Sequence, residues 1–229
     1  KKNKIAVKQK NLESKKVILT DQQTERATLL KTTKNQETLY QENLKDLVKR
    51  QQEIASEIEK IERELRENID PSVLPIPRPG VLLLPIVGGR FSQDYGGTAF
   101  ALRSYRGKWH NGIDIAAPLG TPVLASESGQ VVAVDNQDRF CYKGAYGKYV
   151  VLKHENNLTT LYSHLSLYPV QKGQTVERGD VIGYVGRSGY ATGPHLHFTV
   201  FASPTFIIRP SRSCGPMPVG GDMDPAKYL

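Results

Sequence analysis

The segment Gly193-Pro194-His195-Leu196-His197-Phe198 places two histidines one residue apart at the start of an apolar run. In a β-strand, alternate side chains point to the same face. His195 and His197 would therefore project together, while Leu196 and Phe198 pack on the other face. Imidazole is a common zinc ligand, and two neighbouring imidazoles are hard to explain as core filling. The segment therefore predicts a strand that carries part of a metal site.

A second candidate lies upstream, in His110-Asn111-Gly112-Ile113-Asp114. A histidine and an aspartate four residues apart supply one nitrogen and one oxygen ligand. Gly112 would let the chain turn so that both side chains reach one ion. This spacing is common by chance, so alone it would more often mark an unrelated surface pair.

The remaining histidines are less distinctive. His164 lies in Tyr162-Ser163-His164-Leu165, and strand alternation predicts that it shares a face with Tyr162. His164 becomes a site candidate only because the segments 193–198 and 110–114 already suggest a metal site. His154 has no such support, and we interpret it as structural or as a residue behind the site.

Outward from these motifs, residues 90–229 contain frequent turn residues and short β-prone runs. The runs are 122–125, 130–134, 149–153, 159–162, 181–185 and 196–201. They predict a mostly antiparallel β domain of many short strands. The preceding segment, 70–89, is rich in proline, which favours extended chain. We expect a linker that becomes the first strand or wall of this domain.

Residues 1–69 contain neither Gly nor Pro, and their apolar residues recur at steps of three and four. This predicts a long helix with a coiled-coil seam, covered by a second copy or by a helix upstream of this sequence. The alternative is a solvated spacer helix. The apolar seam positions are Leu12, Leu19, Leu30, Tyr40, Leu44, Leu47, Ile54, Ile58, Ile61 and Leu65. Polar residues interrupt the seam at Lys16, Gln23, Arg26, Thr33, Glu37 and Gln51. The predicted class is α+β.

The composition excludes few functions. The net charge is +8, which suits an anionic polymer such as a cell wall, or nucleic acid. No nucleic-acid motif is present, so we do not expect that partner. No apolar run approaches the roughly 20 residues needed to span a bilayer, and there is no signal peptide. Because the sequence begins with Lys rather than Met, we expect it to be a piece of a longer chain.

The two cysteines, Cys141 and Cys214, do not form a CxxC pair, so a cysteine zinc site is not expected. In an oxidising compartment an even pair favours a disulfide. The alternative is two unrelated buried thiols.

Together these patches resemble the lysostaphin-type, or LytM-domain, zinc endopeptidases of bacterial cell walls. The resemblance covers Arg90 to Leu229 and rests on several motifs in the family's order. They are His110-x-x-x-Asp114, Gly120-Thr121-Pro122-Val123, Gly129-Gln130-Val131-Val132, Gly147 to His154, Tyr162-x-His164-Leu165, Gly173-Gln174-x-Val176-x-x-Gly179-Asp180-x-Ile182-Gly183, Thr192-Gly193-Pro194-His195-Leu196-His197 and Asp224-Pro225-x-x-Tyr228-Leu229.

The resemblance implies roles that the residues alone leave open. It makes His110, Asp114 and His197 the ligands of one zinc ion per chain, and His164 and His195 the catalytic histidines that do not bind zinc. It implies hydrolysis of the peptide cross-links of peptidoglycan, outside the cytoplasm in a bacterial cell envelope, with a membrane anchor possible outside this sequence. The residues expected to contact the substrate are Asn111 and Tyr162.

The match departs from the family at two places. Glu155 follows His154, where the family usually has Gly, and residues 204–222 form an apparent insertion that a disulfide would hold beside the site. A coiled coil fused to a LytM-like domain also resembles division-associated activators of cell-wall amidases. Those typically lack zinc ligands, so the complete set here favours an enzyme. Regulation of that enzyme by the coil, through a recruited partner or by blocking the groove, stays open. A wall-binding scaffold, a bacteriocin and a phage lysin are further alternatives.

Overall fold

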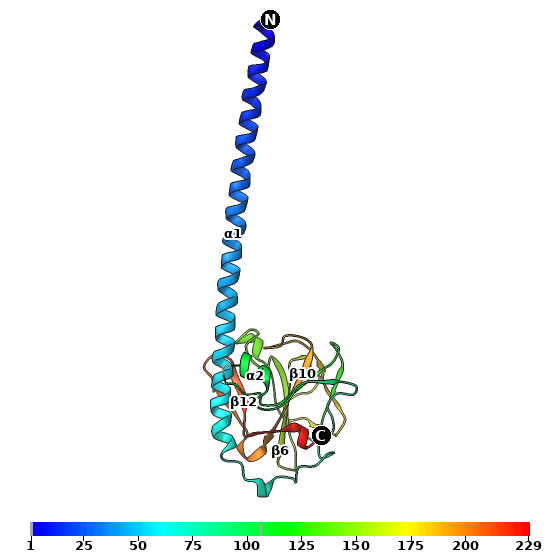
Figure 1. Cartoon of the computed structure of the whole chain (residues 1–229). Helices are drawn as coiled ribbons and strands as arrows, with labels where there is room; N and C mark the ends of the chain where they lie inside the picture. The colour runs from blue at the N-terminus through cyan, green and yellow to red at the C-terminus, as the bar shows by residue number, and fades with distance from the viewer. Residues whose placement is uncertain (1, 106) are drawn as a thin grey trace. The chain divides into compact units, whose positions relative to one another are not determined.

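The computed structural model describes residues 2–105 and 107–229, without the side chains of residues 2–19, 21, 22 and 25. The chain divides into two compact units, Lys1–Asp46 and Leu47–Leu229. Helix α1 (Lys2–Arg66) supplies the described part of the first unit and enters the second (Figure 1). Among the described residues, no helix is both long and apolar enough to cross a membrane.

The predicted long helix is present, but the described residues show no long coiled coil. In the first unit, every described side chain of α1 is exposed, including Leu30 at 71%. The seam residues Leu12, Lys16 and Leu19 lie outside the described side chains. The other helices in the described part of the chain span six residues or fewer, so none can form a long coiled coil with α1. The heptad spacing thus predicted the helix, while its coiled-coil partner stays a prediction.

The last turns of α1 belong to the second unit and are covered differently. Ile54 is 3% exposed, and Ile58, Ile61 and Leu65 pack around the same cluster. Their neighbours in it include Phe201, from the β domain. These seam positions therefore pack on a β-sheet and not on another helix, which corrects the coiled-coil interpretation for this part of the seam.

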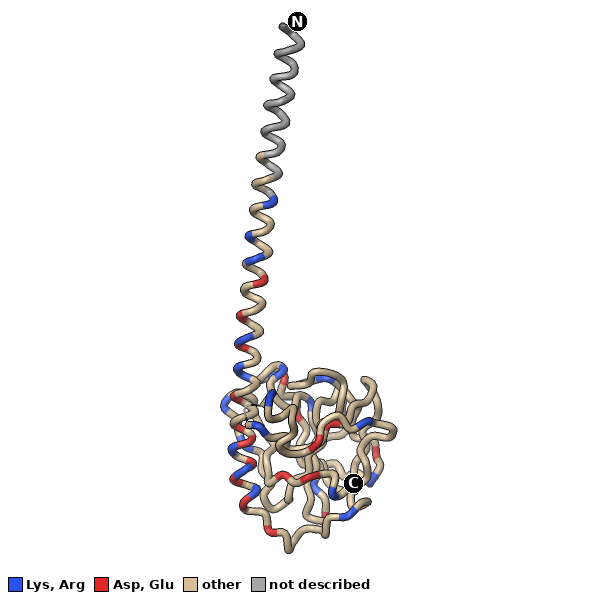
Figure 2. The backbone as a smooth tube through the Cα atoms, viewed as in Figure 1, with Lys and Arg blue, Asp and Glu red and all other residues tan. Residues whose placement is uncertain are grey.

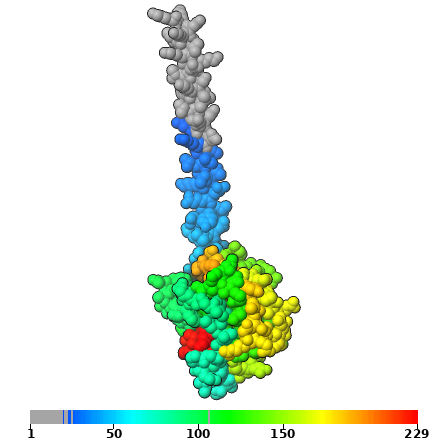
Figure 3. Space-filling model, turned by 90° about the vertical axis from the view of Figure 1, so that its right-hand side faces the viewer, coloured from blue at the N-terminus to red at the C-terminus, as the bar shows by residue number. Residues whose placement is uncertain are grey.

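The proline-rich segment forms a wall of the β domain and not a strand. After the short 3-10 helix η1 (Pro71–Val73), Leu82 and Ile86 are buried in the core. The backbone N–H of Leu82 donates to the carbonyl of Tyr228. In the space-filling view, the C-terminal residues accordingly lie next to this segment (Figure 3). The predicted boundaries 1–69, 70–89 and 90–229 stay predictions.

The main sheet is antiparallel and carries the histidine motifs. Its strands run in the order β1-β2-β10-β6-β5-β4-β8, with β13 beside β10. Their bounds are β1 (Arg90–Gln93), β2 (Ile113–Ala116), β10 (His195–Ala202), β6 (Leu158–Ser163), β5 (Lys148–Lys153), β4 (Gly129–Asn136), β8 (Thr175–Val176) and β13 (Asp222–Met223). A smaller sheet has the order β3-β9-β7, and a hairpin pairs β11 with β12. These are β3 (Pro122–Leu124), β9 (Val181–Val185), β7 (Leu165–Leu167), β11 (Ile207–Ser211) and β12 (Gly215–Val219).

The mostly antiparallel β domain is confirmed, and each of the β-prone runs overlaps a strand. Two features were missed. Helix α2 (Ala99–Ser104), capped by Thr98, is too short to show a period. The apparent insertion forms the β11–β12 hairpin, which the disulfide between Cys141 and Cys214 ties to the loop after the 3-10 helix η2 (Gln137–Arg139). The other 3-10 helices are η3 (Ser203–Thr205) and η4 (Pro225–Lys227).

Both faces of the main sheet are buried. Leu196 and Phe198 of β10 join one hydrophobic cluster, which includes the wall residues Leu82 and Ile86. Phe201, on the opposite face of β10, joins the cluster that receives Ile54 of α1. Because side chains alternate along a strand, His195 and His197 lie on the face of β10 toward which α1 packs.

Candidate metal centre

Strand pairing brings two of the predicted ligands together. His197 of β10 lies directly opposite Asp114 of β2 in the antiparallel register. Gly112 sits so close to β10 that an added Cβ would lie 2.4 Å from the carbonyl oxygen of Phe198. Its backbone angle is not in the left-handed region. Gly112 is therefore required for close packing of the two strands, and not for the turn that the sequence suggested.

The third predicted ligand, His110, completes a compact cluster. His110 Nε2 lies 3.1 Å from Asp114 Oδ1 and 3.0 Å from His197 Nδ1. His197 Nδ1 lies 2.9 Å from the same aspartate oxygen. All three residues are buried. Although burial opposes it, the adjacent His110 and His197 hold the pKa of Asp114 well below its usual value, so the aspartate is an anion.

Neighbouring groups orient the two imidazoles. His110 Nδ1 lies 2.8 Å from the carbonyl oxygen of Asp94, which only accepts, so this nitrogen carries the proton. His197 Nε2 lies 2.9 Å from Thr199 Oγ1. If Nε2 donates to that hydroxyl, the lone pair of Nδ1 faces the cluster. Such outer partners fix the tautomer of a ligand histidine. Thr199 was not predicted, although its place two residues after His197 on the same strand face was available as a signal.

This donor set fits a zinc ion. Ligand atoms about 2.0–2.2 Å from a tetrahedral zinc lie about 3.3 Å apart, close to the separations in this cluster. Without a cation, two imidazole lone pairs and a carboxylate oxygen would face one another at short range in a buried place, which is unfavourable. Three protein ligands also leave the fourth position that a catalytic zinc site requires.

The two other predicted histidines stand beside this cluster. His195 Nε2 lies 3.7 Å from Asp114 Oδ2, and its Nδ1 donates to the carbonyl of Gly193 at 2.9 Å. His164 Nδ1 donates to the carbonyl of Ser188 at 2.8 Å. The rings of His164 and His195 have centroids 4.7 Å apart. In each, the carbonyl takes the Nδ1 proton and leaves Nε2 able to accept one.

His164 reaches this position through an unusual backbone conformation. It has a φ of 60° between the end of β6 and the start of β7, a region that non-glycine residues rarely occupy. Strand alternation therefore does not continue from Tyr162 to His164, and the two do not share a face. Burial, together with His195 and His197 nearby, holds the pKa of His164 well below its usual value, so the ring is neutral.

Tyr162 and His154 lie away from the cluster. Tyr162 is fully buried, and its hydroxyl accepts from the backbone N–H of Ser126 at 2.8 Å. It is a core residue, which corrects its assignment to substrate binding. His154 Nε2 lies 2.7 Å from Thr160 Oγ1, and its Nδ1 lies 3.0 Å from the carbonyl oxygen of Ser128. These are structural contacts.

Comparison with known proteins agrees with this geometry. Residues 108–206 match the family model described as peptidase family M23. The chain is 40% identical over 121 residues to the DD-carboxypeptidase/endopeptidase Mpg of Neisseria meningitidis, covering 52% of this chain and 26% of Mpg. It is 48% identical over 89 residues to the peptidoglycan DD-endopeptidase ShyA of Vibrio cholerae, covering 39% of this chain and 19% of ShyA.

The β domain belongs to peptidase family M23. Among solved structures, the catalytic domain of lysostaphin from Staphylococcus simulans is 29% identical, with a TM-score of 0.47, over 60% of this chain and 90% of that domain. The chain spans about a quarter of the length of Mpg and about a fifth of ShyA.

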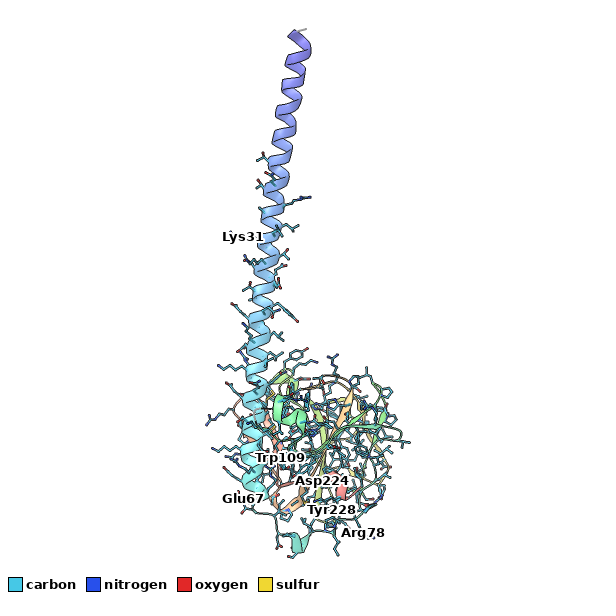
Figure 4. The ribbon with its side chains drawn as sticks, in the orientation of Figure 1. Lys31, Glu67, Arg78, Trp109, Asp224 and Tyr228 are labelled. Carbon is cyan, nitrogen blue, oxygen red and sulfur yellow. A yellow bond between two sulfur atoms is a disulfide. The ribbon has the colours of Figure 1, made fainter. Side chains whose placement is uncertain are left out.

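Asp114 and four histidines line one cavity of about 400 Å³; the histidines are His110, His164, His195 and His197. Asn111, which was predicted to contact the substrate, lines it beside His110. Tyr146, whose hydroxyl accepts from Asn111 Nδ2 at 2.7 Å, stacks its ring on that of His197 with ring centroids 5.8 Å apart. One wall of this cavity comes from outside the M23 match, because α1 contributes side chains between Gln51 and Glu62. Figure 4 labels Trp109, another lining residue, at the last turns of α1.

Proposed function

We propose that this chain is a zinc-dependent endopeptidase that hydrolyses the peptide cross-links of bacterial peptidoglycan. The observation that carries the proposal is the convergence of His110 Nε2, Asp114 Oδ1 and His197 Nδ1 beside two further histidines in one cavity. Membership of family M23 and the names of the relatives Mpg and ShyA support the substrate class.

The chain's own residues suit amide hydrolysis. A zinc ion held by His110, Asp114 and His197 would polarise the scissile carbonyl and lower the pKa of a water molecule. His195 and His164 each keep Nε2 free of its proton because Nδ1 donates to a backbone carbonyl. Either can then take a proton from the attacking water and return it to the leaving amine. The Asp114 carboxylate supplies one negative charge, so a divalent cation leaves the site net positive and favourable to the developing oxyanion.

The proposed location is outside the cytoplasm. Peptidoglycan lies there, and the disulfide between Cys141 and Cys214 is of a kind that persists in oxidising compartments.

The test uses residues 1–229 loaded with zinc and incubated with purified peptidoglycan, with the released fragments identified by mass spectrometry. We expect fragments that end at a cross-bridge peptide bond. The matched control is Asp114→Asn, which keeps the shape of the ligand but removes its charge, and it should release none. Equal release by the control would contradict the proposal. Zinc-loaded protein that releases nothing, yet stimulates a separate amidase, would support the activator alternative.

A further inference from the structure

His164 is held in place by hydrogen bonds from two loops that are distant from each other in the sequence. Its backbone N–H donates to the carbonyl of Tyr146 at 2.9 Å, and its ring Nδ1 donates to the carbonyl of Ser188 at 2.8 Å. Because His164 lies between β6 and β7 with a φ of 60°, strand pairing does not fix the direction of its ring. The two carbonyls therefore decide where Nε2 points.

The carbonyl that holds the ring belongs to a peptide group whose other end is also bound. The Ser188 carbonyl and the Gly189 N–H are the two ends of one planar peptide group. The Gly189 N–H donates to the Asp138 carboxylate, at 3.2 Å from Oδ1 and 3.1 Å from Oδ2. One chain of hydrogen bonds therefore runs from Asp138 through this peptide group to His164 Nδ1. Hydrogen bonds in such a chain polarise one another, and a charged acceptor makes a stronger bond than a neutral one.

Close packing keeps this peptide group in place. Gly189 has a φ of 65°, and a Cβ added to it would overlap the carbonyl oxygen of Ala145. On the other side of the peptide group, Ser188 Oγ accepts from the backbone N–H of Lys148 at 2.9 Å. The Ser188 carbonyl therefore has little freedom to turn away from His164.

Asp138 is itself fixed by the short helix η2 that carries it. Its Oδ1 also accepts from the backbone N–H of Lys143 at 2.9 Å. The preceding residue, Gln137, is buried, and its Oε1 accepts from the backbone N–H of Tyr146 at 3.1 Å. Two neighbouring side chains of η2 thus support the two loops that hold His164.

The contacts of this carboxylate differ from those of other acidic residues in the β domain, which lie at several separate places (Figure 2). Asp114 faces the metal cluster directly, and Asp222 pairs with Arg66. Asp138 accepts from backbone N–H groups, one of which belongs to the peptide group bound to a site histidine. Asp138 therefore acts on His164 through the backbone.

We propose that Asp138 is a positioning residue for the hydrolysis, whose carboxylate holds His164 through the Ser188–Gly189 peptide group so that Nε2 faces the cavity and can accept a proton. This inference rests on the proposed function, which gives His164 that task. Without the support of Asp138 the ring can take the other tautomer, in which Nε2 carries the proton and cannot accept one. Asp138 acts from outside the lining of the cavity, so it should affect the chemical step and not the binding of zinc or substrate.

The test uses zinc-loaded residues 1–229 and a matched pair of variants. Asp138→Asn keeps the size of the side chain but removes its charge. Asp70→Asn makes the same change outside the M23 match, where an exposed carboxylate accepts from the backbone N–H of Ser72 at 2.9 Å. The substrate is a soluble peptidoglycan fragment that keeps a peptide cross-link. Zinc content, kcat and KM are measured on each protein. The Nδ1–H proton resonance of His164, assigned by its loss in His164→Gln, is recorded by NMR.

We expect Asp138→Asn to lower kcat about tenfold with KM and zinc content unchanged, because loss of an outer hydrogen-bond partner at a metal site costs about ten- to a hundredfold in affinity or activity. The Nδ1–H resonance should move upfield, since its bond to the Ser188 carbonyl weakens. Asp70→Asn should match the unaltered chain in every quantity. An unchanged kcat, or a loss that appears in KM or zinc content instead, overturns the positioning role.

The NMR resonance separates this inference from the proposed reaction. An upfield shift in Asp138→Asn, with no hydrolysis even by the unaltered chain, supports the hold on His164 and refutes the reaction. Hydrolysis by the unaltered chain, with an unmoved resonance in Asp138→Asn, refutes the hold alone. Asp138→Ala removes the acceptor as well as the charge and should lower kcat at least as much, and a smaller loss would contradict the proposal. If Asp138→Ala does not fold, the isosteric Asn variant decides the question.

Discussion

The two parts of helix α1 share one pattern of apolar residues but differ in what covers them. Before Asp46, the described seam residues such as Leu30 and Tyr40 are exposed at 71% and 64%. After it, Ile54 is 3% exposed and Ile58, Ile61 and Leu65 pack on the β domain. The same spacing therefore predicts a helix with an apolar stripe, but not the surface on which the stripe lies.

The polar residues of the seam make the same point. Gln51, which interrupts the predicted seam, donates to the carbonyl of Lys143. Glu62 and Arg66, off the seam, contact Asn111 and Asp222 of the β domain. A helix destined for another helix would not need such specific polar partners. The difference between the two parts can be tested by pairs of equal substitutions, one in each part.

The largest difference is expected for the arginines. Arg66→Ala removes the cation from Asp222, whose side chain has no exposed surface. Breaking a buried pair leaves an uncompensated charge, so the free energy of unfolding should fall by about 3 kcal/mol. Because Arg66 lies over the Trp109 ring, urea unfolding followed by far-ultraviolet circular dichroism measures it. Arg26→Ala, in the exposed part, should leave the unfolding midpoint unchanged. Equal losses of stability in the two variants would contradict the difference between the two parts of α1.

Sequence reasoning predicted the fold best where a short run of apolar residues forms a buried strand. The strands β4, β5, β6 and β10 follow apolar runs that pack on the two sheet faces. It left alternatives open where tertiary contacts decide. The segment with Leu82 and Ile86 was expected to become a first strand or a wall. The prolines around these residues lack the N–H groups that strand pairing needs, and the segment forms a wall.

The candidate site was predicted in part for the same reason. His195 and His197 share a strand face, which alternation alone reveals, and Asp114 meets them through strand pairing. The positive φ of His164 breaks alternation, so Tyr162 was misplaced with it. Glu62 could not have been found, because nothing in a helical pattern shows which donor a buried carboxylate will meet.

A smaller difference is expected for truncation of an apolar side chain. Ile54→Ala removes buried methyl groups from the cluster around Tyr146 and should lower the free energy of unfolding by about 2 kcal/mol. Leu30→Ala in the exposed part should have little effect. Urea unfolding of both variants checks this. A similar loss in Leu30→Ala would mean that the exposed part of the seam is also covered.

The third difference concerns pH. Burial, reinforced by the nearby Asp222 carboxylate, holds the pKa of Glu62 well above 4.5, while Asn111 and Arg66 oppose the rise and Glu59 adds to it. The docked helix thus favours protonated Glu62. Its contribution to docking is complete below pH 4.5 and is lost as the pH rises through the raised pKa, by at most about 1.4 kcal/mol per pH unit.

This dependence is measured by the rate of zinc removal by a bulky chelator from pH 4.5 upward, where the helix should dock less tightly as the pH rises. Glu62→Gln keeps an acceptor for Asn111 but cannot ionise, so its profile should be flatter than that of the unaltered chain. Glu42→Gln, in the exposed part of α1, is the matched control and should keep the original slope. Identical slopes in all three proteins would show that Glu62 does not control docking.

The smallest difference is expected for a single hydrogen bond. Gln51→Ala removes the donor to the Lys143 carbonyl but leaves that carbonyl on a loop that water can reach when the helix shifts. A neutral hydrogen bond contributes about 1 kcal/mol, so zinc removal should quicken by about fivefold at most. Gln23→Ala, in the exposed part, should change nothing. Because both glutamines interrupt the same seam, an effect confined to Gln51 would show that contact with the β domain, and not position in the heptad, gives this part of the helix its role.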